Sequence, residues 1–568
     1  MPDDLPSRAG TTFDLVVVGG GVAGLSAAYY WLTDVDPDAR ILIVEQSEEL
    51  GGPARQHTFE VDGHRLLAPG GAQELSFPSS FPPPVRTALV DLGIDTGRFY
   101  DDAVAGHYTS RGAGGHGFAF AAEVWGRSHT AVFRPDTGGD FGDAPVSPPA
   151  RAQIAALITA PTDWLAGRTD EEKLAELRTH SCDGLLREFA ALDDDVHRFL
   201  RFSTSPHSGL AFDQHPALDA ALIGYVGLDG IDVEGGGDGA PWKGLTHTGT
   251  RFFAHRDPPI FRFPDGNATV ARALAHRLVP DLFAATSVDE RLGADMATEA
   301  LDRPGNQVRI LLGTAAVELR RDGPDRVVVR VEARDGTTAT HRAPAAVVAT
   351  GAHDAARLVT GLDPEQRATA EALGRFPIVS ATVALRNWRA WPAIGVNTLS
   401  WPGHPSWQIA SLGFPVRMGG FEPPSSPDAP NVVTTLGGLT TPGRPPSDGA
   451  AEGRRRLASP TARAELRAEL RRLLAEALAP GGFDADRDIA EVRVELWPQG
   501  YARYSTSLDG PDDEGRIGPG ARERLADGTG PIAVVGVDVV DHPFLDGAME
   551  SAHRAVHRIA SGPKASAR

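Results

Sequence analysis

Cysteine is almost absent from this sequence of 568 residues, in which Cys182 stands alone. One cysteine excludes an internal disulfide and any cysteine-based metal or iron–sulfur site. Long apolar runs are also missing, and no stretch approaches the roughly 18 residues of a membrane span. The acidic opening MPDDLPSRAGTT lacks the cationic start and the apolar run of a secretory signal. We therefore expect a cytoplasmic protein that neither holds a metal nor enters a membrane.

Lysine is nearly as rare, and Lys173, Lys243 and Lys564 are its only three representatives. The formal net charge of −20 argues against binding to nucleic acid, because phosphates repel an acidic surface. The same charge would favour the approach of a cationic small molecule. A small-molecule substrate is expected, whereas the sequence gives no indication of the oligomeric state.

The order of apolar runs predicts how the chain is organised. An apolar run, a glycine turn, a periodic helical segment and a second apolar run open it, which predicts a βαβ unit. Residues 150–222 have a helical pattern, and the runs QVRILLGTAAVELRR and DRVVVRVEA alternate like antiparallel strands. A further strand–helix pair closes the chain. We therefore predict a discontinuous nucleotide-binding domain with a second domain inserted between its parts.

The first turn, in DLVVVGGGVAGLSAAYYWL, has the glycine spacing of a dinucleotide-binding loop. Gly19 permits the tight turn, Gly21 lets the backbone approach a pyrophosphate, and Gly24 allows close helix–strand packing. The phosphates would lie at the positive end of the helix that begins at Val22 and Ala23. A merely structural glycine turn is the alternative.

The second strand, 41–44, is followed by Glu45 and Gln46. Glu45 lies 21 residues after Gly24, where a carboxylate can accept both hydroxyls of a ribose. It would repel a 2′-phosphate, which disfavours NADP.

Two glycine pairs favour a flavin over a nicotinamide. Gly51-Gly52 follows Glu45 at the spacing that resembles the extended fingerprint of flavoproteins of the glutathione-reductase and amine-oxidase type. Arg55 could neutralise the pyrophosphate. Gly70-Gly71-Ala72 would let the backbone pass beside an isoalloxazine ring, although a plain β-turn would also explain this pair.

The C-terminal segment VVGVDVVDHPFLDGAMESAHRAV fits the same cofactor. Asp538 ends an apolar strand and could bind the ribityl chain, and Ala548 and Met549 would open a helix whose N-terminus faces the flavin N1–C2=O edge. An ordinary helix-entry turn is the alternative. Three other positions complete the predicted cofactor site: Val317, which could meet adenine through its backbone, and Thr350 and Gly351 in the turn after a buried strand.

These patterns predict an α/β fold. Its FAD domain is Rossmann-like and of the two-dinucleotide-binding type, and an α+β substrate domain is inserted into it. The expected parts are 1–75, 301–360 and 501–568 for the FAD domain, and 76–300 (mostly helical and loop-rich) and 361–500 for the substrate domain.

Beyond these motifs, the sequence resembles the bacterial spermidine dehydrogenases and their relatives in the flavin amine oxidase superfamily. The resemblance extends from about residue 13 to 558, and its most specific segments are FRFPDGNATVARALAHRLVP, FPIVSATVALRNW, GGFDADRDIAEVRVELWPQGY and DGAMESAHRAV. It implies a bilobal fold, bound FAD, and oxidation of an amine C–N bond by hydride transfer to flavin N5. The imine that results would be hydrolysed to an aldehyde. The FAD is expected to be non-covalent, because Cys182 lies in a helical segment far from the C-terminal flavin strand.

The sequence departs from this family near the expected flavin. Gln499 replaces a histidine before Gly-Tyr, and Gly536-Val537-Asp538 replaces Asn-Ser-Asp. These changes affect the expected polyamine substrate rather than the FAD. The best-known member also carries haem b, but no axial ligand can be placed here, so a haem is not expected.

The candidate catalytic residues are chiefly aromatic, because ring faces can hold an amine by cation–π attraction. Trp497, Tyr501 and Tyr504 in WPQGYARYS are the first candidates, with packing between domains as the alternative. Lys243 is the only plausible lysine to hold a water near N5, since Lys173 is expected on a charged helix face. Glu74 could recognise a substrate ammonium, unless it is simply solvated.

Two other functions stay open at the level of sequence. The first is an FAD-dependent desaturase or oxidase of a non-amine specialised metabolite, which would use the same hydride chemistry. The second is a non-redox flavoprotein or a binding module that keeps the fold.

Overall fold

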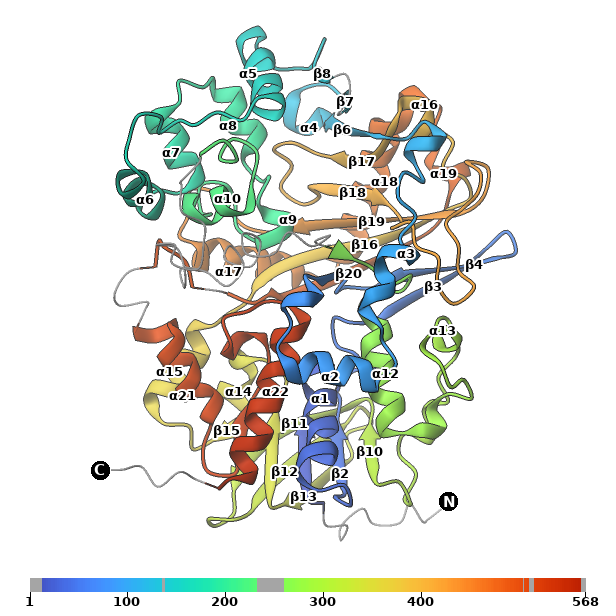
Figure 1. The fold of residues 1–568 in the computed structure, drawn as a ribbon, viewed down its shortest axis with the longest axis vertical. Coiled ribbons are helices and arrows are strands. Elements are labelled where there is room, and N and C mark those ends of the chain that lie inside the picture. The colour runs from blue at the N-terminus through green and yellow to red at the C-terminus, as the bar shows by residue number, and fades with distance from the viewer. Residues whose placement is uncertain (1–12, 135–137, 232–259, 504, 510–514, 563–568) are drawn as a thin grey trace.

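The computed structural model describes residues 13–134, 138–231, 260–503, 505–509 and 515–562. A five-stranded sheet, parallel throughout, forms the centre of the lower half in Figure 1. Its strands are, in spatial order, β10 (Val308–Leu311), β2 (Ile41–Val44), β1 (Leu15–Val18), β14 (Ala345–Val348) and β21 (Ile532–Val534). Distant parts of the chain supply these strands, which confirms the predicted α/β fold with a discontinuous Rossmann-like domain.

These strands are aliphatic because both faces of the sheet are covered. Alternate side chains enter two separate cores. One core contains the helices α1 (Val22–Tyr30), α2 (Pro83–Asp91), α12 (Ala268–Leu278) and α22 (Leu545–Ala560). Helices α2 and α12 thus pack around α1, although they lie within 76–300, the range expected for the substrate domain.

The opposite face of the parallel sheet packs against a second, four-stranded sheet. It consists of β13 (Thr338–Ala343), β12 (Val327–Ala333), β11 (Thr314–Arg321) and β15 (Val359–Thr360), and its core includes α14 (Ala352–Leu358), α15 (Pro364–Ala372) and α21 (Pro519–Asp527). The run QVRILLGTAAVELRR was expected to be antiparallel, and for its first half this is wrong. A turn at Gly313, with φ +60°, divides the run, so that β10 pairs in parallel with β2 and only β11 is antiparallel to β12.

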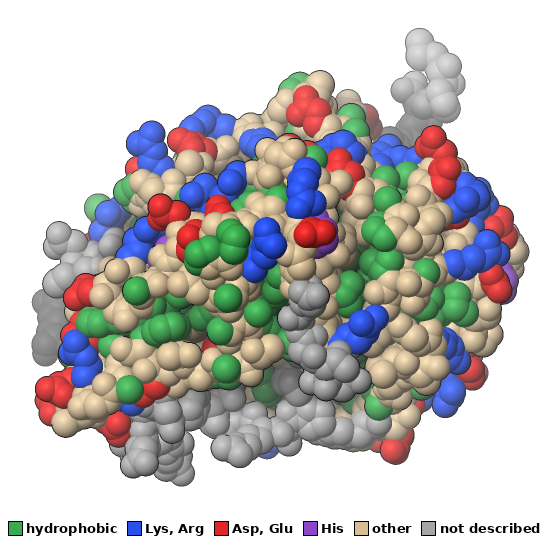
Figure 2. All heavy atoms as spheres, turned by 90° about the horizontal axis from the view of Figure 1, so that it is seen from above, with side chains coloured by type: hydrophobic (Ala, Val, Ile, Leu, Met, Phe, Trp, Pro, Cys, Tyr) green, Lys and Arg blue, Asp and Glu red, His purple; other side chains and the backbone are tan. Residues whose placement is uncertain are grey.

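The upper half of Figure 1 is the second domain, built on a mixed eight-stranded sheet. Its strands are, in spatial order, β20 (Ile489–Tyr501), β16 (Phe376–Leu385), β19 (Asn431–Gly438), β18 (Ile409–Leu412), β17 (Val396–Ser400), β6 (Gly115–Phe120), β7 (His129–Arg134) and β8 (Gly138–Asp140). The predicted helical region comprises α5 (Pro148–Thr159), α6 (Asp170–Thr179), α7 (Cys182–Phe189), α8 (Asp194–Leu200), α9 (Ser205–Ser208) and α10 (Ala217–Ile223). Seen from above, this half carries interspersed acidic and basic side chains (Figure 2).

Two short pairs of strands lie between the halves (Figure 1). The hairpin of β3 (Gln56–Val61) and β4 (His64–Pro69) packs on the eight-stranded sheet. Strand β5 (Leu75–Ser76) pairs with β9 (Ile260–Phe261). The chain therefore passes from the nucleotide-binding domain to the second domain directly after the Gly51-Gly52 pair.

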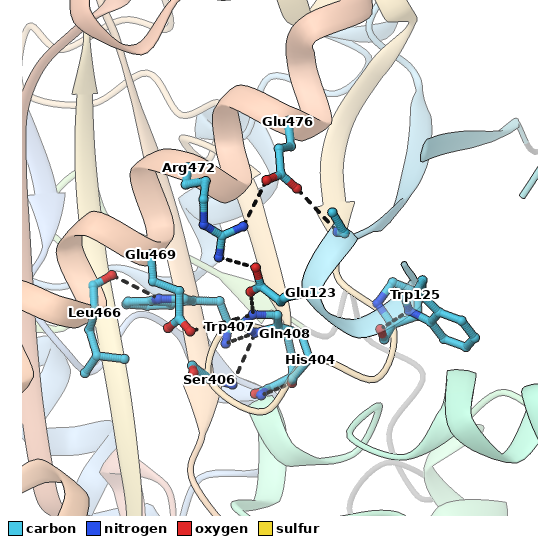
Figure 3. Close-up of polar contacts among 12 residues, drawn as sticks. Glu123, Trp125, His404, Ser406, Trp407, Gln408, Leu466, Glu469, Arg472 and Glu476 are labelled. Carbon is cyan, nitrogen blue, oxygen red and sulfur yellow. Dashed lines mark hydrogen bonds and ion pairs between the residues drawn. The ribbon is translucent and has the colours of Figure 1, made fainter. Parts of the chain in front are cut away.

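Two more helices, α17 (Pro446–Leu457) and α18 (Ala462–Leu478), belong to the second domain, and a polar network fixes α18 to it (Figure 3). His404 is 1% exposed, and its Nε2 lies 2.8 Å from Oε1 of Glu123 in α4 (Ala122–Trp125). Arg472 of α18 forms ion pairs with both Glu123 and Glu476. Helix α18 thus docks through charged residues as well as through its leucines.

Candidate cofactor and substrate site

The first glycine loop and the Gly51-Gly52 pair are in direct backbone contact. Gly21 and Gly51 form a parallel bridge, and the Gly51 N–H donates to the Gly20 carbonyl at 2.9 Å. A Cβ atom on Gly24 would lie 1.9 Å from the Gly19 oxygen, and one on Gly51 would lie 2.2 Å from the Ala54 oxygen. Gly51 also has a φ of +100°, a conformation that other residues rarely adopt. Both motifs therefore need glycine for close packing of their backbones.

Glu45 is held in place at the end of β2. Its Oε2 accepts the Gly20 N–H at 2.7 Å and its Oε1 accepts the Ser47 N–H at 2.7 Å, and the residue is 8% exposed. The Thr314 N–H donates to the Glu45 carbonyl at 2.9 Å, so β11 begins beside this carboxylate. Val317 occupies the irregularity in the pairing of β11 with β12. Gln46 is exposed next to Glu45.

The second glycine pair lies against the first. The Gly70 N–H donates to the Arg55 carbonyl at 2.8 Å, and the Ala72 N–H donates to the Pro53 carbonyl at 2.7 Å. A Cβ atom on Gly71 would lie 2.5 Å from the Pro53 oxygen and 2.9 Å from Cζ2 of Trp497. Strand β20 thus brings an aromatic side chain of the second domain to the glycine segments of the first.

Arg55 lies at the same junction. Its guanidinium is 5.0 Å from the centroid of the Trp497 ring, and its Nε donates to the Gly52 carbonyl at 3.0 Å. The Trp497 indole N–H donates to Ser380 Oγ at 3.0 Å. The ring is therefore fixed by β16 on one side and by Arg55 on the other.

The PDGN segment of FRFPDGNATV directly precedes α12 and is hydrogen-bonded to the chain just after the second glycine pair. The Asn267 N–H donates to the Ala72 carbonyl at 3.1 Å, and its Nδ2 donates to the Glu74 carbonyl at 3.0 Å. Asp265 is fully buried and accepts from the Thr269 hydroxyl. Burial raises the pKa of Asp265 to about 6, against the lowering effect of that hydrogen bond. Sequence reasoning used this segment only for the family resemblance and missed its supporting role.

Asp538 lies at the edge of the site formed by the carboxyl ends of β14 and β21. It is 2% exposed and sits in a 3-10 turn, Val537–Val539, beyond β21 rather than at the end of the strand, as the sequence had indicated. Its Oδ2 accepts the Ala352 N–H at 2.9 Å, directly after Gly351, whose φ is +115°. The predicted residues Thr350, Gly351 and Asp538 are therefore brought together, although 187 residues separate Gly351 from Asp538.

A residue that the sequence did not identify completes this edge. Arg375 donates from Nε to Asp538 Oδ1 at 2.9 Å and from Nη2 to Oδ2 at 2.9 Å. Its backbone N–H donates to Gln499 Oε1 at 3.0 Å. Gln499, which stands where the family has a histidine, thus holds the backbone of Arg375, and Arg375 in turn orients Asp538. The only signal in the sequence is that Arg375 directly precedes FPIVSATVALRNW.

The closing helix α22 begins at Leu545, close to the predicted start. Met549 is fully buried, and Ala548 is 9% exposed. His542 Nε2 lies 3.0 Å from both carboxylate oxygens of Asp546, which fixes the turn before the helix. Gly547 packs under His542, because an added Cβ would lie 2.6 Å from the His542 carbonyl oxygen.

The residues at the ends of β1 and β14 fit an FAD. No described side chain caps the N-terminus of α1, so its first N–H groups can meet an anion. The buried Thr350 hydroxyl has no hydrogen-bond partner among the described residues. β1 and β14 are neighbours where the strand order reverses, which is where doubly wound sheets bind nucleotides.

The predicted catalytic aromatics differ in their surroundings. The Tyr501 hydroxyl donates to the Pro206 carbonyl at 2.9 Å, and the ring packs against Leu210, Phe376 and Ala450. Burial, and to a lesser extent the nearby Glu74 carboxylate, raises the pKa of Tyr501, so the phenol stays protonated. Tyr504 and Lys243 lie outside the described residues.

The charged candidates have partners in the structure. Glu74 Oε2 accepts from Arg262 Nε at 3.1 Å and from Nη2 at 2.9 Å, so this carboxylate is paired with an arginine rather than simply solvated. The expectation for Lys173 is wrong: it is 8% exposed and its Nζ lies 2.5 Å from Asp163 Oδ2. The long aliphatic side chain of Lys173 can be buried while its ammonium reaches Asp163.

Residues 17–88 match the family described as the NAD(P)-binding Rossmann-like domain. That segment contains the end of β1, all of α1 and β2, and both glycine pairs. No curated protein matches the sequence. Among the described residues, no helix combines the length and apolar character needed to cross a bilayer.

Solved structures show the same fold over almost the whole chain. Wild-type putrescine oxidase bound to putrescine has a TM-score of 0.53 and 15% identity, and the match covers 97% of this chain and 99% of that one. Cyclohexylamine oxidase from Brevibacterium oxydans IH-35A has a TM-score of 0.53 and 16% identity, with the same coverage of 97% and 99%. This likeness confirms the bilobal α/β architecture.

Proposed function

We propose that this protein is an FAD-dependent oxidoreductase that oxidises the C–N bond of an amine. The contact of Gly21 with Gly51, extended through Gly71 to Trp497, is the observation that carries the proposal. These contacts join a nucleotide-binding loop of the first domain to an aromatic side chain of the second domain. An enzyme needs such a connection when its cofactor is bound by one domain and its substrate by the other. The fold shared with putrescine oxidase and cyclohexylamine oxidase supports an amine substrate.

FAD, when bound, supplies a hydride acceptor for the carbon next to the amine nitrogen. The chain's own residues bind and orient. Glu45 would accept the ribose hydroxyls, the first N–H groups of α1 would face the pyrophosphate, and Asp538 would face the ribityl chain. Val317 and Thr350 are proposed as further contacts.

The aromatic residues of β20 would orient the amine. Trp497 and Tyr501 are both held by hydrogen bonds through their polar atoms, to Ser380 and to Pro206. Fixed rings hold an amine with little loss of conformational entropy, and their faces attract a cation. Because Tyr501 stays protonated, its role is positioning rather than proton abstraction.

The resemblance to the spermidine dehydrogenases suggests a polyamine-like amine. Gln499, which replaces the family histidine, accepts a hydrogen bond from the backbone N–H of Arg375, the residue paired with Asp538. We therefore expect this replacement to affect cofactor binding rather than the choice of substrate. A polyamine therefore stays within the proposed substrate class. The cytoplasmic location stays a prediction.

One observation favours a second candidate, an FAD-dependent oxidase or desaturase of a non-amine metabolite. Arg262 neutralises Glu74, the carboxylate that was the candidate for recognition of an ammonium. A neutral substrate would not need this group.

The test starts from the purified protein. Visible flavin absorption, and release of FAD on denaturation, would support the cofactor. Aldehyde and ammonia or a shortened amine should then form from polyamines or from simple primary and secondary amines when an artificial electron acceptor is supplied. A yellow protein that turns over none of these amines but oxidises a neutral metabolite would favour the second candidate, and a folded, colourless protein that does not take up FAD would contradict both.

A further inference from the structure

Two histidines of the last helix face one aspartate near the N-terminus. His553 and His557 lie on α22, and Asp34 lies in the segment Trp31–Val35 that follows α1. The Asp34 Oδ2 atom is 3.1 Å from His557 Nε2 and 3.5 Å from His553 Nε2. The three donor atoms lie within 4.8 Å of one another.

Local geometry explains why these residues meet. Residues four apart on a helix lie on the same face, so His553 and His557 project together, and their ring centroids are 4.4 Å apart. The turn Trp31–Val35 is a π-helix, in which the Asp36 N–H donates to the Trp31 carbonyl at 2.9 Å. This wider turn ends α1 and presents Asp34 to α22. Such π-turns occur frequently at functional sites.

The carboxylate of Asp34 is oriented by a neighbour. Thr33 Oγ1 donates to Asp34 Oδ1 at 2.7 Å, which leaves Oδ2 directed at the two imidazoles. The edge of the Tyr30 ring packs on His553, with ring centroids 5.0 Å apart and an interplanar angle of 77°. A hydrogen bond to the second carboxylate oxygen and packing around a ligand are the outer contacts that orient metal ligands.

We propose that Asp34, His553 and His557 form a binding site for a divalent transition-metal ion such as Zn²⁺. Ligands about 2.0–2.1 Å from a tetrahedral ion are separated by roughly 3.3 Å, and the distances of 3.1 and 3.5 Å bracket this value. Two imidazole nitrogens and one carboxylate suit zinc, nickel or copper better than magnesium or calcium. The side chains are 24–48% exposed, so water can complete the coordination.

A second cluster of potential metal ligands differs from the Asp34 cluster in that arginines already pair with its carboxylates. Glu123, His404 and Glu469 also approach one another (Figure 3), but Arg472 forms an ion pair with Glu123 and Arg456 with Glu469. These arginines already neutralise the carboxylates. Among the described residues, no arginine or lysine forms an ion pair with Asp34, whose charge is therefore available to a cation.

An ion at this site would join the first and last helices of the nucleotide-binding domain. Helix α1 carries the glycine loop at its other end, and α22 packs along it. The sequence alone predicted no metal, because the ligands lie 523 residues apart and form no linear motif. The inference is independent of the proposed redox function, since it concerns only these two helices.

The test uses the full chain, without a polyhistidine tag and after dialysis against a chelator. Isothermal titration with ZnCl₂ should give one ion per chain, and Zn²⁺ should raise the Tm of the protein. The variant His557→Ala, which changes a half-exposed side chain, should lose this binding and the rise in Tm. Asp34→Asn should weaken it, and Thr33→Val should weaken it by roughly 10-fold or more through the orientation of the carboxylate.

The control is His64→Ala, which removes an exposed histidine at the tip of the β3–β4 hairpin. It should bind Zn²⁺ like the wild type. Absorption of the Co²⁺-loaded wild type in the visible range should be altered by His553→Ala but not by His64→Ala. The proposal is overturned if the wild type binds no Zn²⁺, or if His557→Ala binds it with unchanged stoichiometry and affinity.

Discussion

Arg375 and Asp538 form a buried, bidentate ion pair between the start of β16 and the turn after β21. Nitrogens Nε and Nη2 of Arg375 each lie 2.9 Å from an Asp538 oxygen, and the side chains are 17% and 3% exposed. The pair joins the second domain to the edge of the nucleotide-binding domain at which Thr350 and Gly351 lie. Its loss would leave a buried charge without its partner.

We predict that Arg375→Met destabilises the protein by about 3–5 kcal/mol and reduces its FAD content. Chemical denaturation and the ratio of flavin to protein absorption measure the two effects. Arg357→Met is the matched control, because Arg357 is 69% exposed and pairs with Asp354 on the surface. Equal stability of the two variants would show that the buried pair has no special role.

The second prediction concerns Glu45. Glu45→Gln should weaken FAD binding roughly 10- to 100-fold, because hydrogen bonds from ribose hydroxyls to a charged acceptor contribute about 1.5–3 kcal/mol. Fluorescence titration of the apoprotein with FAD measures the change. Glu48→Gln, a change in the same loop at a side chain that is 68% exposed and pairs with the exposed Arg334, should bind like the wild type. If both variants bind FAD equally, Glu45 does not hold the ribose.

A third prediction separates the ring of Tyr501 from its hydroxyl. Tyr501→Phe leaves the Pro206 carbonyl without its donor and should lower stability by about 1–3 kcal/mol, with little change in kcat/KM for an amine. Tyr501→Ala should lower kcat/KM by roughly 10-fold or more, since the ring face is lost.

Tyr108→Phe is the control for stability, because that hydroxyl also donates to a buried carbonyl, of Gly413, at 2.7 Å. It should lose similar stability and keep full activity. A Tyr501→Ala enzyme as active as Tyr501→Phe would argue against an aromatic role in substrate binding.

The fourth prediction concerns pH. Because folding raises the pKa of Asp265 to about 6, the folded protein retains this proton after the unfolded chain has lost it. The contribution of Asp265 to stability therefore falls as pH rises from about 4 to 6, by roughly 3 kcal/mol at most. Asp265→Asn should lack this decrease and gain stability relative to the wild type above pH 6.

Denaturant unfolding at several pH values measures this difference. Asp295→Asn, at a side chain 92% exposed, should follow the pH profile of the wild type. Parallel profiles for Asp265→Asn and the wild type would mean that Asp265 ionises normally in the folded protein.

The local parts of the fold could be predicted from the sequence. Strand β2 has the predicted bounds 41–44, and α1 begins at Val22 as expected, because buried parallel strands are short aliphatic runs and a glycine turn marks the start of the helix. The prediction failed where one apolar run forms two strands that belong to different sheets. The β10–β11 segment alternates throughout, yet a turn at Gly313 assigns its halves to different sheets.

Contacts between distant residues were beyond the sequence. Arg375 and Asp538 are 163 residues apart, and Glu74 and Arg262 are 188 apart. No local periodicity reports such ion pairs, because they depend on how the two domains are joined. The glycine motifs were predictable because each satisfies a backbone requirement of its own, whereas the aromatic residues of β20 needed the structure to connect them with Gly71.

The central claim is tested most directly by anaerobic titration of the purified flavoprotein with amines, followed by flavin absorption. We predict that a polyamine or a simple primary or secondary amine bleaches the flavin stoichiometrically, and that admission of an electron acceptor restores the oxidised spectrum. A flavin that stays oxidised with every amine of such a panel would contradict the proposed amine oxidation.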